Sequence, residues 1–314
     1  MNLFYSHYII CVIFSQGISL LGEIKKAIRQ VFNYEKWLTF CALMYRKSGV
    51  DKSVRENTYV ISLTSIPSRI HKVHIVIESL LTQSYKPASL VLWLSEYNRE
   101  GIKVLDRDNL PLILKRQMKR GLDVYFCDDI RSYRKLLPSI ERFPESHIVT
   151  ADDDIIYPKD WLEKLVKVHS SNPNFIICYR GVEITLNKER TALKPYLEWP
   201  EYTQKNEPSS YLFPQGGEGT IYPKGAFNKE LFNQSVFLNV CLTADDVWFK
   251  SMSLFNDIKC VKITEKHQDF LRVRDSQGDD TLHFVNNIQG QNDVQINEVF
   301  EKYNLIACLK SKSL

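Results

Sequence analysis

Short apolar runs alternate with segments of helical periodicity through the middle of the chain. The runs cover residues 59–63, 90–94, 124–127, 147–151 and 175–179. Val73, Ile77 and Leu80 recur at the spacing of a buried helix face, and Trp161, Leu165 and Val168 do so further along. Strands that alternate with helices predict a Rossmann-like α/β fold, in which a mostly parallel central sheet has helices on both faces.

The two ends of the chain have different patterns from the middle. Residues 23–47 have the spacing of a helix, residues 48–57 form a polar linker, and a late helical pattern covers residues 294–303 within a polar stretch. We therefore predict an N-terminal apolar and helical segment over residues 1–50, a main domain over 58–274, and a C-terminal polar and helical extension over 275–314.

The N-terminal segment raises the question of a membrane. Its first 22 residues contain no Asp, Glu, Lys or Arg, but polar side chains interrupt the apolar run. The pattern therefore predicts neither a good membrane-spanning helix nor a cleaved signal peptide. Lys25, Lys26 and Arg29 follow. An apolar segment before a basic turn fits peripheral attachment to an anionic membrane surface, and a helix packed on the main domain fits equally well.

Composition and charge narrow the class of protein. The 314 residues are 44% hydrophobic, which is enough for a substantial core. The 41 basic and 37 acidic residues leave a net charge of +4, so the sequence predicts no nucleic acid partner. Seven cysteines, an odd number without a C-x-x-C pair, predict reduced thiols in the cytoplasm.

The strongest local signal is the stretch H-I-V-T-A-D-D-D-I-I-Y-P, an apolar strand followed by three carboxylates. Alternate side chains of a strand share a face, so Asp152 and Asp154 would point together and Asp153 elsewhere. Such a pair suits Mn²⁺ or Mg²⁺, and ligands bind at the carboxyl ends of parallel strands in open α/β sheets. The alternative is a solvated turn in which an Asp caps the next helix.

This strand and triplet resemble the D-x-D motif of nucleotide-sugar glycosyltransferases with the GT-A fold. The resemblance extends over about residues 59–263 and includes V-I-S-L-T-S-I-P-S-R-I, a Gly-rich segment and T-A-D-D-V-W-F. It is closest in kind to bacterial family 2-like enzymes of surface polysaccharide synthesis. The resemblance implies that residues 58–274 are a catalytic domain and that residues 63–69, with Thr64 and Arg69, line the nucleotide site.

The resemblance also implies roles within the triplet and after the third strand. Asp152 would bind ribose or the donor sugar, and Asp154 would bind the metal that bridges the diphosphate. We group Asp153 with the donor-binding residues. Donor binding is further predicted for three residues after the third strand, for which capping and a solvated helix face are the alternative: Asp128, Asp129 and Lys135.

A second acidic pair and a Gly-rich segment complete the predicted site. By resemblance Asp246 is the first choice for a general base and Asp245 the second, although Thr243 with Asp246 also fits a capping box. The segment Gln215–Gly219 would let a bound sugar approach the backbone, and Gly216, Gly217 and Glu218 are predicted to bind acceptor; a tight turn is the alternative. His283 is a predicted metal ligand and His267 a weaker one, since an ordinary structural histidine explains each as well.

These features together predict transfer of a sugar from a nucleotide-sugar donor to a glycan or lipid-linked saccharide acceptor. The resemblance implies dependence on Mn²⁺ or Mg²⁺ and inversion at the transferred carbon. Two alternatives are a sugar nucleotidyltransferase and a noncatalytic carbohydrate-binding or scaffold protein. The first is disfavoured because this sequence lacks the Gly- and Lys/Arg-rich phosphate loop that such an enzyme has near its first strand. No Walker motif is present in the sequence, which disfavours a P-loop enzyme.

Overall fold

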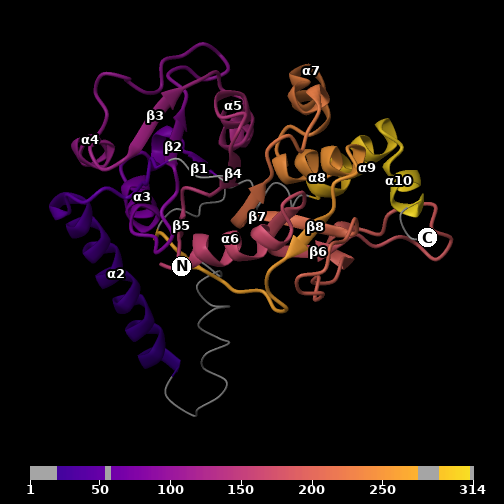
Figure 1. Ribbon diagram of the computed structural model, residues 1–314, viewed down its shortest axis with the longest axis horizontal. Coiled ribbons are helices and arrows are strands. Elements are labelled where there is room, and N and C mark those ends of the chain that lie inside the picture. Colours follow the sequence, from indigo (N-terminus) through magenta and orange to yellow (C-terminus); the bar gives the residue numbers. More distant parts are fainter. Residues whose placement is uncertain (1–19, 54–57, 275–289, 312–314) are drawn as a thin grey trace.

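The protein is built around one seven-stranded mixed sheet (Figure 1). The computed structural model describes residues 20–53, 58–274 and 290–311, with the backbone alone for residues 20–29. The strands lie in the order β3 (Leu122–Phe126), β2 (Ser89–Leu94), β1 (Tyr59–Thr64), β4 (His147–Thr150), β7 (Leu212–Tyr222), β6 (Ile176–Glu183) and β8 (Cys260–Lys262). β7 runs antiparallel to its neighbours β4 and β6, and the other pairs are parallel.

Alternation along the strands divides the core into two layers. In β1, Tyr59, Ile61 and Leu63 face one layer and Val60 faces the other. The first layer is formed with α2 (Leu20–Met44), α3 (Val73–Leu81), α4 (Leu112–Met118) and α6 (Trp161–Ser171). The second layer includes α5 (Leu137–Arg142), α7 (Gln234–Val240), α8 (Asp245–Phe255), α9 (Gln291–Lys302) and α10 (Leu305–Ser311). The predicted α/β fold with helices on both faces is thus confirmed.

Three elements of the structure were not predicted from the sequence: the strand that contains the Gly-rich segment and two short strands. The Gly-rich segment is neither a turn nor a loop; it lies inside β7, although Pro214 and three glycines are poor strand residues. The stretches of β7 on either side of the glycines pair with β6, and residues 220–222 also pair with β4, whereas the register with β6 shifts between Cys178 and Arg180, opposite the glycines. The sequence pattern also missed the short pair β5 (Ile155–Ile156) and β9 (Leu271–Arg272), which is too short to show a period.

The helices at both ends pack onto the main domain. Leu38 of α2 belongs to the first core layer, and Ile296, Val299 and Phe300 of α9 belong to the second. Within the described ranges, no helix combines the length and apolar character needed to cross a bilayer. The cysteines that the structure describes are all free thiols.

A buried pair of histidines joins the start of β4 to the last turn of α6. The rings of His147 and His169 are 4.4 Å apart between centroids, and Nδ1 of His169 is 3.0 Å from the Tyr59 hydroxyl. Nδ1 of His147 accepts a hydrogen bond from the backbone N–H of Lys224 at 3.2 Å. Burial lowers the pKa of each imidazole to about 4, and positive charge on the neighbouring ring or on Lys224 adds to the effect.

We expect this pair to make the fold sensitive to acid. Each histidine is neutral in both the folded and the unfolded chain above pH 6.5, so the fold is then at its full stability. As pH falls from 6.5 toward 4, the unfolded chain binds protons that the folded protein does not, and the free energy of unfolding decreases. Between about pH 7.5 and 5, each histidine should cost about 2 kcal/mol of stability. Thermal melts across this pH range measure the decline in stability. His169→Gln should make the decline shallower, whereas His71→Gln, at an exposed position, should not change it. An equally steep decline in His169→Gln would contradict the assignment.

Candidate functional site

The acidic triplet lies at the carboxyl edge of the sheet, directly after the central strand β4. Because β1, β2, β3 and β4 are parallel, the segments that follow them meet at this edge. The loop after β1 brings Ser65 and Arg69 into contact with Asp153 of the triplet, although they lie 88 and 84 residues before it in the sequence. β9 pairs antiparallel with β5, and this pairing places Arg272, near the C-terminal end of the main domain, beside the triplet.

Asp153 and Asp154 share one arginine. Nη1 of Arg69 lies 2.7 Å from Oδ1 of Asp153 and 3.5 Å from Oδ2 of Asp154, and the Ser65 hydroxyl donates to Asp153 at 2.5 Å. Arg272 is 3.7 Å from the other oxygen of Asp154. β4 ends at Thr150, so the strand alternation that we expected does not extend through the triplet, and Asp153 does not point away from Asp154.

Lys135 joins the triplet to the second acidic pair. Its ammonium lies 3.0 Å from Asp152 and 3.1 Å from Asp245, and its side chain is only 8% exposed. The 3₁₀ helix Arg131–Lys135 on the second face of the sheet positions it. Lys135 was predicted to bind donor; in the structure its charge is already shared between two carboxylates of the protein, which ties the two acidic segments into one site.

Asp246 is held by the Gly-rich strand. Its Oδ2 accepts a hydrogen bond from the backbone N–H of Gly216 at 3.0 Å. The alternative of a capping box is wrong, because Ala244 is the N-cap of α8, no side chain caps it, and the Thr243 hydroxyl accepts from Gln295 instead. The carboxylates at the start of α8 therefore face the triplet rather than the end of their own helix.

The ionisation of these carboxylates reflects burial among like charges. The pKa of Asp246 is raised to about 7 and that of Asp154 to about 6, mainly by burial and in addition by neighbouring aspartates, against the opposing effect of Lys135 or Arg272. Burial likewise raises the pKa of Asp153, although Arg69 opposes it. Burial also acts on Asp152, but Lys135 outweighs it and holds the pKa of Asp152 below its usual range.

The glycines of β7 make room for the acidic groups of the protein itself. A Cβ at Gly216 would lie 2.7 Å from Oδ1 of Asp246, and one at Gly217 would lie 3.5 Å from Oδ2 of Asp152. Gly219 has a φ of +107°, and a Cβ there would lie 2.5 Å from the ring of Trp161. A side chain is therefore excluded at Gly219 and would displace the Asp246 carboxylate at Gly216, whereas the contact at Gly217 is of ordinary van der Waals length.

Aromatic side chains fix the loop after β4. The Tyr157 hydroxyl accepts the backbone N–H of Asp152 at 2.8 Å and donates to the carbonyl of Gly217 at 2.8 Å. Nε1 of Trp161 donates to the carbonyl of Glu218 at 2.7 Å. Both aromatic residues are buried. These bonds hold the triplet and β7 in one arrangement.

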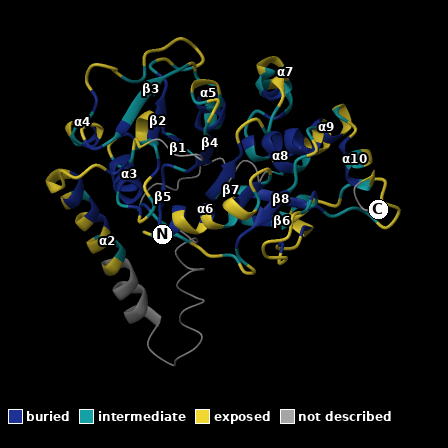
Figure 2. Ribbon diagram, viewed as in Figure 1, coloured by how far each residue is buried: buried dark blue, intermediate teal, exposed yellow. Residues whose placement is uncertain are grey.

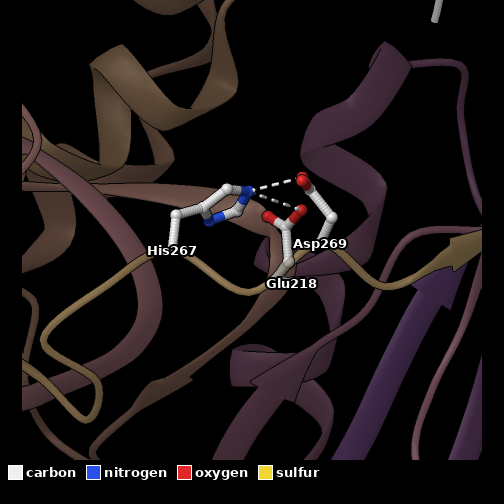
Figure 3. Close-up of side chains that lie close together, drawn as sticks. All are labelled: Glu218, His267 and Asp269. Atoms are coloured by element: carbon white, nitrogen blue, oxygen red, sulfur yellow. Dashed lines mark hydrogen bonds and ion pairs between the residues drawn. The ribbon is translucent and has the colours of Figure 1, made fainter. Parts of the chain in front are cut away.

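A second group of side chains lies beside β7 (Figure 3). Nε2 of His267 is 2.8 Å from Asp269 and 3.9 Å from Glu218, and Nη1 of Arg180 is 3.3 Å from the same oxygen of Glu218. Among the described residues, Glu218, His267 and Asp269 are the group whose candidate metal-ligand atoms all lie within 4.8 Å of one another. The Arg180 guanidinium, which already pairs with Glu218, opposes a cation there.

The remaining predicted site residues have other partners or lie outside the description. The Thr64 hydroxyl donates to the carbonyl of Trp93 at 2.9 Å. Asp129 accepts the backbone N–H of Arg131 at 3.1 Å and lies 3.7 Å from Arg134, while Asp128 is exposed beside it. His283 lies outside the described residues.

Sequence reasoning missed several residues of this site. Ser65 was inside the quoted loop but was not singled out, and Tyr157 gave only an apolar signal. Arg272 gave no signal at all, because a lone arginine in a two-residue strand has neither periodicity nor a motif. Its place beside Asp154 follows from the pairing of two short segments far apart in the chain.

No family model and no curated protein matches the chain. Among solved structures, the chain is similar to the mannosyltransferase PcManGT from Pyrobaculum calidifontis, solved in complex with GDP-Man and Mn²⁺. The two are 12% identical, the match covers 90% of this chain and 82% of that one, and the TM-score is 0.42. A similarity of this degree does not identify a family for the chain.

Proposed function

We propose that the protein is a metal-dependent glycosyltransferase that moves a sugar from a nucleotide-sugar donor to a glycan or lipid-linked acceptor, with inversion, in surface polysaccharide synthesis. The observation that carries the proposal is the joining of two acidic segments at the carboxyl edge of the sheet. Asp152, Asp153, Asp154, Asp245 and Asp246 meet there with three basic side chains, Arg69, Lys135 and Arg272.

The charge balance supports a divalent cation. Five carboxylates against three cations leave two negative charges when all are ionised, and burial together with the neighbouring aspartates raises the pKa values of Asp154 and Asp246. Asp154 and Asp152 would hold Mn²⁺ or Mg²⁺, since carboxylate oxygens are the ligands that these hard ions prefer. A bound cation would neutralise charge that develops on the diphosphate as it leaves.

Basic residues beside the triplet suit the phosphates of a donor. The side chain of Arg69 is 23% exposed and that of Arg272 is 38% exposed, so both guanidinium groups reach solvent beside the triplet. A guanidinium binds phosphate oxygens through paired N–H groups. Lys135, in contrast, is buried between Asp152 and Asp245 and serves to position the two acidic segments.

Asp246 is the proposed general base. In the transfer step the acceptor oxygen attacks the anomeric carbon, the bond from that carbon to the diphosphate oxygen breaks, and the acceptor proton passes to Asp246. A carboxylate with a pKa of about 7 accepts a proton far better than an ordinary aspartate. The Gly216 N–H holds one oxygen of the carboxylate in place.

A donor screen with the purified full-length protein tests the proposal. We expect release of nucleoside diphosphate from one nucleotide-sugar in the presence of Mn²⁺, suppression by a chelator, and faster release when a saccharide acceptor is added. Consumption of a nucleoside triphosphate with sugar phosphate would instead show a nucleotidyltransferase. Saccharide binding without turnover of any nucleotide-sugar would show a noncatalytic protein and would overturn the proposal.

A further inference from the structure

Exposed positions alternate with buried ones along the described part of α2 (Figure 2), and several of the exposed positions carry large apolar side chains. Leu38, Cys41 and Ala42 are buried against the domain, whereas Trp37 is 51%, Phe40 50% and Met44 56% exposed. The last three are spaced i, i+3 and i+7 and so lie on one side of the helix. The rings of Trp37 and Phe40 stack at 5.7 Å. Contiguous exposed apolar side chains of this size mark an interaction surface.

The charge on this face is of one sign. Between Gln30 and Ser48 the exposed charged residues are Lys36, Arg46 and Lys47. The acidic residue in that stretch, Glu35, is buried and accepts hydrogen bonds from the backbone N–H and Nε of Arg274 at 2.7 and 2.8 Å. The neighbouring helix α4, whose Arg116 donates to the Leu43 carbonyl, adds the exposed Lys115 and Lys119 and no acid.

The sequence before α2 continues the same chemistry. The first 22 residues have no charged side chain, and one acidic residue, Glu23, and three basic ones, Lys25, Lys26 and Arg29, follow within the helix. Nineteen of these residues precede Leu20, where α2 begins. The apolar and basic face of α2 is therefore continuous in the chain with an apolar segment and a basic turn.

We propose that the exposed face of α2 docks on an anionic lipid bilayer, with the helix lying in the plane of the interface. Lysine is depleted from protein interfaces, whereas lysines flanking Trp and Phe are the composition of interfacial helices on anionic lipid. The aromatic rings reach the headgroup boundary and the basic side chains contact lipid phosphates. This inference does not depend on the proposed catalytic function.

Flotation of the full-length protein with vesicles tests the proposal. We expect binding to phosphatidylcholine vesicles that contain about one third phosphatidylglycerol, and much weaker binding to phosphatidylcholine alone. The double substitution Trp37→Ser with Phe40→Ser should reduce the partition coefficient roughly 30-fold. Lys36→Gln with Lys47→Gln should reduce binding to the anionic vesicles only.

A matched pair of substitutions controls for loss of exposed apolar area. Tyr97 and Leu197 are 51% and 72% exposed on other segments, so Tyr97→Ser with Leu197→Ser should leave binding unchanged. Melting temperatures establish that each variant is folded. Undiminished vesicle binding by the Trp37 and Phe40 variant would overturn the proposal, because the N-terminal segment would then carry attachment. Failure of the parent protein to bind, or a dimer that this variant dissociates in sedimentation without vesicle binding, would also overturn it.

Discussion

Asp246→Asn is expected to lower the rate of sugar transfer by about 10²- to 10⁴-fold, the usual contribution of a positioned general base. Donor and Mn²⁺ binding should stay nearly unchanged, because Asn can still accept the hydrogen bond from the Gly216 N–H that holds this side chain. The measurement is turnover at saturating donor together with a donor-binding isotherm. In the parent enzyme, turnover should rise with pH through about 7, where Asp246 loses its proton.

The same substitution should not weaken the fold, which separates a base from a structural carboxylate. An acid whose folded pKa is raised from 3.8 to about 7 contributes stability below pH 3.8 that is lost as pH rises through 7. Removing this charge should therefore stabilise the protein at about pH 8, on the order of 1–3 kcal/mol. Thermal melts at pH 8 and pH 4 check the sign, and the gain should vanish at the lower pH.

Two further variants locate the effect on the catalytic carboxylate. Asp257→Asn makes the same chemical change at an exposed position just beyond the end of α8 and should alter neither turnover nor donor binding. Asp245→Asn removes one partner of Lys135 and should disturb donor binding as well as rate. An active Asp246→Asn enzyme would refute the assignment, and a rate loss confined to Asp245→Asn would move the base by one residue.

Asp154→Asn is expected to weaken Mn²⁺-dependent binding of nucleoside diphosphate by roughly 100-fold. Loss of a residue that only supports a metal ligand costs 10- to 100-fold in affinity, and loss of a ligand should reach at least the upper end. Isothermal calorimetry with Mn²⁺ and nucleoside diphosphate measures this without turnover. In the parent protein, binding should strengthen as pH rises through about 6, since Asp154 must ionise.

The competing explanation for Asp154 is a purely structural pairing with Arg69 and Arg272. In that case Asp154→Asn would leave Mn²⁺ affinity intact and would destabilise the fold by leaving two arginines with less negative charge nearby. Asp160→Asn is the matched control, since its pairing with Lys164 is half exposed and contributes little. A folded Asp154→Asn protein with unchanged affinity would reject the metal assignment.

The sequence by itself determined the strands β1 to β4 and the start of β6, the helices α3 and α6, and the edge of the sheet at which the site lies. The apolar runs have the period of strands and the intervening segments have the period of helices, and both periods arise from contacts that each segment makes with one core layer. A carboxylate triplet directly after an apolar strand then had to emerge at the carboxyl edge of the sheet. These properties follow from the order of residues along one segment.

The tertiary structure alone decided how the charges are paired. Lys135 contacts Asp152 and Asp245 because the 3₁₀ helix after β3 and the start of α8 meet above β4 and β7. The Gly-rich segment became part of a strand because the stretches on either side of it pair with β6 and β4, and the missing side chain at Gly216 lets Asp246 reach the backbone there. Charge pairing depends on which ends of the segments meet in space, and this depends on the order and direction of the strands. The spacing of apolar residues within one segment contains no information about either.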